Sequence, residues 1–302
     1  MLNIKTIDRA LAKYIDQTRQ SDPSCAESLA IYGALLKEAA AIAAENTTPV
    51  VQWSEDELKA VLEDEDKTLM QGGQIVIDPA HFEASLRRMA KVFLASVETD
   101  DEARKLCEEV DWSDYATASL ADLAGTDPMQ YMQAIVELSP DENVLDLFVL
   151  PVVGFTLRAF LDASATHASQ RLEALVPDTV HEERRLACPV CGAPAAIAAV
   201  VETPRNGNIK KLYCTCCGGS WKFERIRCAV CGTEAVSDLE YVHDEADDKH
   251  RLHVCKNCDS AMPTVFAGDE TGFCPDVENI YMSRLAGFWE EEKSRKEAEG
   301  EA

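Results

Sequence analysis

The sequence lacks a long uninterrupted hydrophobic run. Its most apolar stretch, Leu147–Leu157, is short and is broken by Pro151 and Gly154. A helix needs about 20 apolar residues to cross a bilayer. The first twenty residues also lack the apolar core and the small-residue cleavage site of a secretory signal. We therefore expect no membrane insertion and a cytoplasmic location.

Basic residues are scarce as well. The chain holds 29 Lys and Arg against 54 Asp and Glu, which gives a formal net charge of -25 and a pI near 4.5. An acidic surface of this size repels the phosphate backbone of nucleic acids and attracts cationic partners, although it can also serve solubility alone. The composition therefore disfavours nucleic acid as a partner.

Known catalytic signatures are missing too. The sequence contains no G-x-S-x-G elbow, no H-E-x-x-H motif, no Walker loop and no Rossmann fingerprint. Acidic residues are so numerous that pairs of carboxylates carry no information about a site. We therefore expect that the protein is not an enzyme.

The first 177 residues are predicted to form a helical domain. Ile4, Ile7, Leu11 and Ile15 recur at the spacing of one helix face, and similar patterns follow. Turn signals such as Gly72-Gly73 separate them. The predicted helices span 4–19, 24–45, 54–69, 79–97, 101–110, 114–124, 128–138 and 142–172.

Beyond residue 177 the chain becomes rich in Gly and Cys, with short strand-like runs at 197–202, 209–213 and 221–226. A final amphipathic helix follows. The predicted fold class is α+β multidomain: an all-α N-terminal domain, two small rubredoxin-like or zinc-ribbon units of four cysteines each, and a C-terminal helix. The predicted boundaries are 1–177, 186–226, 227–265 and 276–298.

The cysteine-rich region contains an internal repeat. Two C-x-x-C-G pairs recur at an offset of 40 residues, and two further C-x-x-C pairs recur at an offset of 41. The repeat indicates that the first two pairs form one site and the last two pairs form another. The eight cysteines are Cys188, Cys191, Cys214, Cys217, Cys228, Cys231, Cys255 and Cys258.

This spacing predicts two metal ions per chain. Each C-x-x-C pair places two sulfurs on one side of a tight turn, which needs a residue tolerant of positive φ; Gly192, Gly218, Gly232 and Asp259 follow the four pairs. Four thiolates suit Zn²⁺ and also a single iron of rubredoxin type. A closed site of this kind stabilises a small domain, and iron would add one-electron chemistry.

Four further cysteines lie outside the repeat. We interpret Cys216, beside Cys217, as a bystander, with a reactive thiol or an alternative ligand as the other interpretation. Cys274 could supply a fifth thiol, which the complete sets of four disfavour. Cys25 and Cys107 fall in predicted helices and are expected to pack as small apolar side chains.

One stretch reverses the acidic trend. Between residues 184 and 227 there are eight basic residues and two acidic ones. The stretch could bind RNA or DNA with Tyr213, Trp221 and Phe223 as stacking residues, dock onto the acidic helical domain, or bind an acidic partner. The basic residues are Arg184, Arg185, Arg205, Lys210, Lys211, Lys222, Arg225 and Arg227.

The four C-x-x-C pairs, with Trp221 and Arg225 between the two units, resemble the formate dehydrogenase accessory protein family FdhE. The resemblance is specific over about seventy residues. It implies a helical N-terminal part, two rubredoxin-like units whose eight cysteines bind metal, and packing of the units through Trp221 and Arg225. The segment that begins at Asp259 and the adjacent pair Cys216-Cys217 depart from the family pattern.

The resemblance also implies a function. We expect a cytoplasmic, chaperone-like protein that binds the catalytic subunit of formate dehydrogenase during maturation and does not itself oxidise formate. A zinc-ribbon nucleic-acid-binding protein and a rubredoxin-like redox protein are the alternatives, and a homodimer is left open. Residues 1–180 carry a formal charge of -18, so a cationic client segment, such as a twin-arginine leader, is a further hypothesis.

Overall fold

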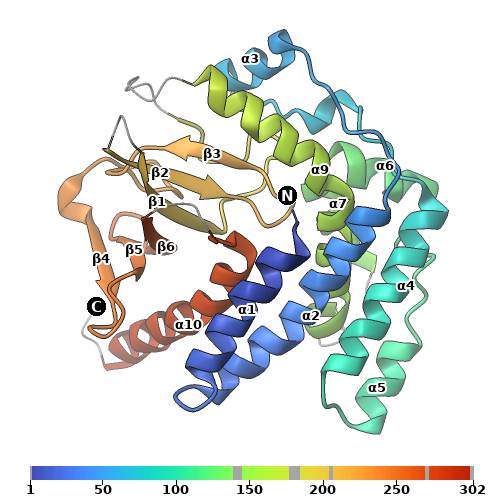
Figure 1. Cartoon of the computed structure of the whole chain (residues 1–302), viewed down its shortest axis with the longest axis horizontal. Coiled ribbons are helices and arrows are strands. Elements are labelled where there is room, and N and C mark those ends of the chain that lie inside the picture. Colours follow the sequence, from blue (N-terminus) through green and yellow to red (C-terminus); the bar gives the residue numbers. More distant parts are fainter. Residues whose placement is uncertain (1, 139–144, 177–183, 204–206, 269–271, 300–302) are drawn as a thin grey trace.

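The computed structural model describes residues 2–138, 145–176, 184–203, 207–268 and 272–299. A layer of helices comes first in the chain, a single β-sheet follows, and the last helix packs beside the first two helices and against the sheet (Figure 1). The four-cysteine clusters lie in the sheet region. This architecture confirms the predicted fold class.

Short polar side chains start several of the helices. Asn3, Asp22 and Asp78 each accept a hydrogen bond from backbone N–H groups of the first helical turn, and Ser54 forms a capping box with Glu57. The helices of this layer are α1 (Ile4–Thr18), α2 (Pro23–Glu45), α3 (Glu55–Glu63), α4 (Pro79–Ser96), α5 (Asp101–Glu108), α6 (Ala118–Thr126), α7 (Pro128–Leu138) and α9 (Leu150–Leu175).

One predicted helix is shorter than its sequence pattern suggests. The helix expected at 54–69 ends at Glu63, and a non-helical segment with a turn at 65–66 leads to a 3-10 turn, η1 (Met70–Gly72). The backbone N–H groups of Leu69 and Met70 instead donate to the carbonyls of Pro189 and Val190, at 3.1 Å each. A tertiary hydrogen-bond pair therefore overrides local helix propensity here.

Helix α9 is the central helix of this layer. A π-helix, η2 (Leu145–Val149), runs directly into it, and Pro151, which has no N–H to donate, lies just after this junction. Residues 142–144 of the predicted helix lie outside the described residues. The segment Leu147–Leu175 is long and apolar enough to cross a membrane by composition, but 67% of its most apolar window is buried in the protein. Such burial is typical of a core helix.

The two cysteine units share one six-stranded sheet. Its strand order is β3-β2-β1-β6-β5-β4, and neighbours are antiparallel except for the parallel pair β1 and β6 at the centre. Each unit contributes three consecutive strands in the same relative order, so the second unit repeats the first across the sheet. The strands are β1 (Ile197–Thr203), β2 (Gly207–Tyr213), β3 (Ser220–Phe223), β4 (Leu239–His243), β5 (His250–Cys255) and β6 (Ser260–Gly268).

The last helix, α10 (Pro275–Glu299), ties the sheet to the N-terminal helices. The Tyr14 hydroxyl of α1 donates to the Glu278 carboxylate at 2.6 Å, and Nε2 of His250 in β5 lies 2.9 Å from the same carboxylate. Nδ1 of His250 lies 2.7 Å from Asp247. Burial alone would raise the pKa of Glu278, but the hydrogen bonds from His250 and Tyr14 lower it.

Candidate metal centres

The described residues contain two groups of four cysteines that could each hold a metal ion. Within each group the four Sγ atoms all lie within 4.8 Å of one another. The structure thus groups the eight cysteines into the same two sets of four that the internal repeat predicts. Site 1 comprises Cys188, Cys191, Cys214 and Cys217, and site 2 comprises Cys228, Cys231, Cys255 and Cys258.

The sulfur positions fit a tetrahedral ion. In site 1 the Sγ atoms of Cys188 and Cys217 lie 3.7 Å apart, and those of Cys191 and Cys214 lie 3.6 Å apart. Both corresponding separations in site 2 are 3.7 Å. A tetrahedron with Zn–S bonds of about 2.3 Å has edges of about 3.8 Å, whereas a disulfide bond is about 2.05 Å long. Both donor sets suit Zn²⁺ or a single iron ion, and two ions per chain can be held.

The turns that carry the cysteines have the predicted backbone. Gly192, Gly218 and Gly232 have φ values of 80°, 83° and 77°, and Asp259, the non-glycine residue with positive φ in the described part of the chain, has a φ of 56°. This conformation lets backbone N–H groups point at the sulfurs. The N–H of Gly219, for example, lies 3.3 Å from the Cys217 Sγ.

The surroundings of the thiols lower the pKa of some cysteines at each site and raise that of others. Burial raises the pKa of Cys217 in site 1, and it raises that of Cys255 in site 2 to about 12. In site 1, hydrogen bonds from neighbouring thiols, Cys188 first, hold the pKa of Cys214 well below its ordinary value. In site 2, partial burial acts to raise the pKa of Cys231, but the side-chain amide of Asn257, 3.4 Å away, and other hydrogen bonds lower it to about 6. Since thiolates are the metal ligands, the cysteines with a lowered pKa are ready to bind a metal ion, whereas those with a raised pKa would lose their proton when the ion binds.

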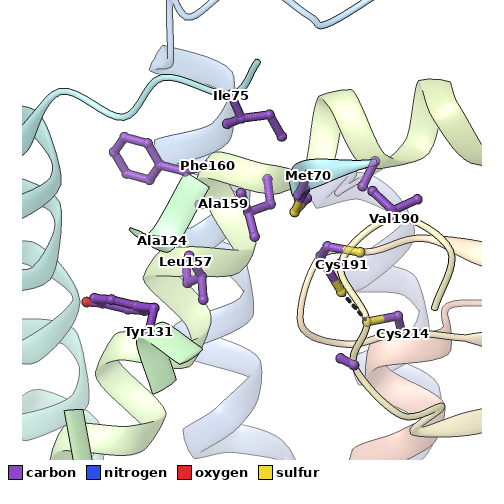
Figure 2. Close-up of a cluster of buried hydrophobic side chains, with 14 of the residues drawn as sticks. Met70, Ile75, Ala124, Tyr131, Leu157, Ala159, Phe160, Val190, Cys191 and Cys214 are labelled. Carbon is purple, nitrogen blue, oxygen red and sulfur yellow. Dashed lines mark hydrogen bonds between the residues drawn. The ribbon is translucent and has the colours of Figure 1, made fainter. Parts of the chain in front are cut away.

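The two sites differ in burial. All four site 1 cysteines are buried, and Figure 2 shows Cys191 and Cys214 on the side of the helical core that carries Met70 and Val190. Site 2 is more accessible, because Cys231 is exposed and Cys258 is half-buried. Site 1 therefore belongs to the core between helices and sheet, whereas site 2 lies near the surface.

A buried ion pair connects site 1 to helices α9 and α10. Arg158 is 5% exposed; its guanidinium pairs with Asp162 and Asp276 and donates to the backbone carbonyl of Cys217 at 3.2 Å. Burial would lower the pKa of Arg158, but the carboxylates of Asp276 and Asp162 raise it above its ordinary value. Gly218 packs so tightly on this guanidinium that a Cβ atom would overlap it.

The basic stretch docks the first unit onto the helical layer. Arg185 donates to the carbonyl of Val61 at 2.5 Å and to three more carbonyls just after α3. Lys211 pairs with Glu173 at 2.9 Å, and Lys222 donates to the Glu173 carbonyl. Of the three interpretations of this stretch, these contacts favour docking within the chain.

The aromatic residues near the basic stretch do not form an open stacking surface. Trp221 and Phe223 are buried, and the Trp221 indole N–H donates to the Arg185 carbonyl at 2.8 Å. Tyr213 is half-buried and packs against Phe273. Arg225 is exposed. Trp221 therefore contributes to packing against the helical layer, and the nucleic-acid interpretation loses its stacking residues.

The other cysteines lie outside both clusters, as far as the described residues extend. Cys25 is buried in α2, and Cys107 is half-buried in α5. Cys274 precedes α10, and burial raises its pKa to about 12. Cys216 is half-buried and lines a cavity beside site 1.

The sequence reasoning missed the role of α10 at the two sites. Asp276 near its start pairs with Arg158 at site 1, and Lys293 pairs with Asp259 at the last turn of site 2. One signal was available for the residue that Asp276 pairs with: Arg158 and Asp162 lie four residues apart in the most apolar part of α9, which is typical of a buried ion pair.

Comparisons with known proteins agree with this geometry. No family model matches the chain. FdhE homologues match about a third of the chain: one from Aquifex aeolicus is 26% identical over 106 residues (35% of this chain and 37% of the homologue), and one from Pseudomonas putida is 34% identical over 100 residues (31% and 30%). The matched segments thus span about a third of each homologue's length.

A solved structure matches almost the whole chain. The crystal structure of the FdhE protein from Pseudomonas aeruginosa aligns with a TM-score of 0.55 at 15% identity, over 96% of this chain and 91% of the other. At this identity the match shows a shared fold. This chain therefore shares the fold of an FdhE protein, and it is similar to FdhE homologues over about a third of its length.

Proposed function

We propose that this protein is an accessory protein that binds the catalytic subunit of formate dehydrogenase and is needed for its assembly or activity. One observation carries the proposal: the chain has two four-cysteine clusters in one sheet on a helical body, in the arrangement of an FdhE fold that covers 96% of it. Each cluster joins two turns of one cysteine unit, so bound metal would stiffen the sheet region as a binding scaffold requires.

The ligand sets support a role that is not catalytic. Four thiolates fill a tetrahedral ion, so each site would lack the open position that metal-assisted hydrolysis needs. When bound, a metal ion would cross-link the turns that carry each set of cysteines. The eight site 1 and site 2 cysteines would hold the two ions.

Affinity purification from the native host under anaerobic conditions tests the proposal. The unaltered chain should recover a formate dehydrogenase catalytic subunit, identified by mass spectrometry. A variant with Cys228→Ser and Cys231→Ser should lose the site 2 metal, and reduced recovery would show that binding depends on metal. Cys107→Ser, which removes a thiol outside both clusters, is the matched control. Recovery of ribosomal or nucleic-acid-associated proteins without a dehydrogenase would contradict the proposal.

A rubredoxin-like redox role is a second candidate, favoured by the position of site 2 near the surface. The exposed Cys231 brings this site within reach of a partner, as electron exchange requires. Metal analysis and visible absorption of anaerobically purified protein test it. Iron with reversible bleaching on reduction would support the role, whereas stoichiometric zinc at both sites would contradict it.

A further inference from the structure

An apolar groove opens where helices α2, α7, α9 and α10 meet the second cysteine turn of site 1. It encloses a cavity of about 660 Å³. Its walls include Tyr32, Met132, Phe155 and Ile280, and the rings of Tyr32 and Phe155 stack with their centroids 6.3 Å apart. Packing within the described chain leaves this surface uncovered.

The groove continues beyond this cavity along α7. A neighbouring hollow of about 530 Å³ is lined by Met129 and Val136, and both hollows share Met132 and Leu150. Met129 and Val136 are 40% and 48% exposed. An elongated apolar surface lined by methionines suits a polypeptide segment, because methionine adapts its shape to the apolar side chains of a partner.

The charges in the groove favour one kind of segment. Its charged lining residues are Arg158, Asp276 and Asp127. Arg158 already pairs with Asp162 and Asp276, so the surplus charge of the groove is negative. The chain as a whole carries -25. Basic residues beside an apolar segment would therefore be attracted, and acidic ones repelled.

We propose that this groove binds an apolar segment of a client polypeptide that is flanked by basic residues. The inference rests on the proposed function, since it names the surface that would receive the client. Thr215 and Cys216 in the groove wall lie between the site 1 ligands Cys214 and Cys217. Metal at site 1 would therefore fix one wall of the groove, which links metal binding to client binding.

Filling the groove tests the proposal without disturbing the core. A Cβ atom at Gly154, in the groove wall on α9, would meet no atom within 4 Å. Gly154→Trp therefore fills the groove, and it removes a glycine from a helix. Gly287→Trp is the matched control, because Gly287 lies in α10, has the same open space and is outside the groove. A second variant, Met132→Glu with Leu150→Glu, makes the floor polar.

The probe is a fluorescent synthetic peptide with a central Leu- and Phe-rich run and Lys flanks, titrated into each protein. A second peptide has the same centre and Glu flanks. We expect binding of the Lys-flanked peptide to weaken by about tenfold or more in both groove variants, through loss of apolar burial, and to be unchanged in Gly287→Trp. Circular dichroism and metal content show whether each variant is folded.

Equal binding by Gly154→Trp and Gly287→Trp would overturn the proposal, and so would equal binding of the two peptides. The affinity purification separates this inference from the proposed function. If Gly154→Trp recovers the dehydrogenase subunit as well as the unaltered chain does, the groove is not the client site and the accessory function stands. If the unaltered chain recovers no subunit, the proposed function fails.

Discussion

Substitution of Gly218 by alanine should destabilise the protein far more than the same change at another glycine of similar backbone. Gly218 follows a site 1 ligand and has a φ of +83°. Gly207 has a φ of +67°, and a Cβ atom there would meet nothing within 4 Å. The pair therefore separates the cost of the backbone conformation from the cost of lost packing space.

The magnitude follows from what each new methyl group meets. An L-residue in the left-handed region costs about 1–2 kcal/mol, which is the whole expected effect of Gly207→Ala. At Gly218 the methyl group would also overlap the guanidinium of Arg158. Moving Arg158 would leave the carboxylate of Asp162, which is 1% exposed, without its ionic partner. Breaking a buried ion pair costs about 3–5 kcal/mol, so Gly218→Ala should lose about 3 kcal/mol more than Gly207→Ala.

Urea unfolding followed by circular dichroism measures both changes. Each sample needs the same free metal concentration, because bound metal contributes to the free energy of unfolding. Gly192→Ala gives an intermediate point, since its Cβ would lie 3.3 Å from a methyl carbon of Thr68. The reasoning would be refuted if the three variants unfolded at the same urea concentration.

Three further predictions concern the sites and the sheet. A chelator should remove metal from site 2 before site 1, because Cys231 is exposed whereas the site 1 cysteines are buried. A colorimetric dye measures the metal released over time, and simultaneous loss of both ions would contradict the prediction. Glu278→Gln should remove a stabilisation that is present at neutral pH and lost as the pH falls below about 4.5, because the folded-state pKa of Glu278 is lowered. Urea unfolding midpoints at pH 7 and pH 4 check this. If the variant and the unaltered chain showed the same pH dependence, the prediction would be refuted. Trp221→Phe should cost about 1 kcal/mol through loss of the indole hydrogen bond to the Arg185 carbonyl, and an unchanged thermal midpoint would contradict that role.

Local sequence information predicted the cysteine turns well. The C-x-x-C spacing and the next residue determine where the sulfurs and the positive φ angles lie, so even Asp259 could be anticipated. The start of α2 could also be predicted, because Asp22, a residue that caps helix N-termini, precedes its first apolar residues. These features depend on residues a few positions apart in the chain.

Features that depend on distant residues could not be predicted in this way. The end of α3 at Glu63 depends on hydrogen bonds from Leu69 and Met70 to a turn more than a hundred residues away. The joining of both units in one sheet depends on the parallel pairing of β1 with β6, and neither strand carries a sequence signal for it. The groove is assembled from four helices and one turn, so its lining has no local signature.

The pairing of β1 with β6 has a consequence for biosynthesis. During translation, β1 emerges before the second unit, whereas its parallel neighbour, Ser260–Gly268, is the last strand of that unit to emerge. One edge of β1 would therefore stay open on the ribosome, and open strand edges promote aggregation. Helix α10, whose Glu278 binds Tyr14 of the first helix, emerges later still. The nascent chain should thus remain dependent on cellular folding factors until its last helix has docked.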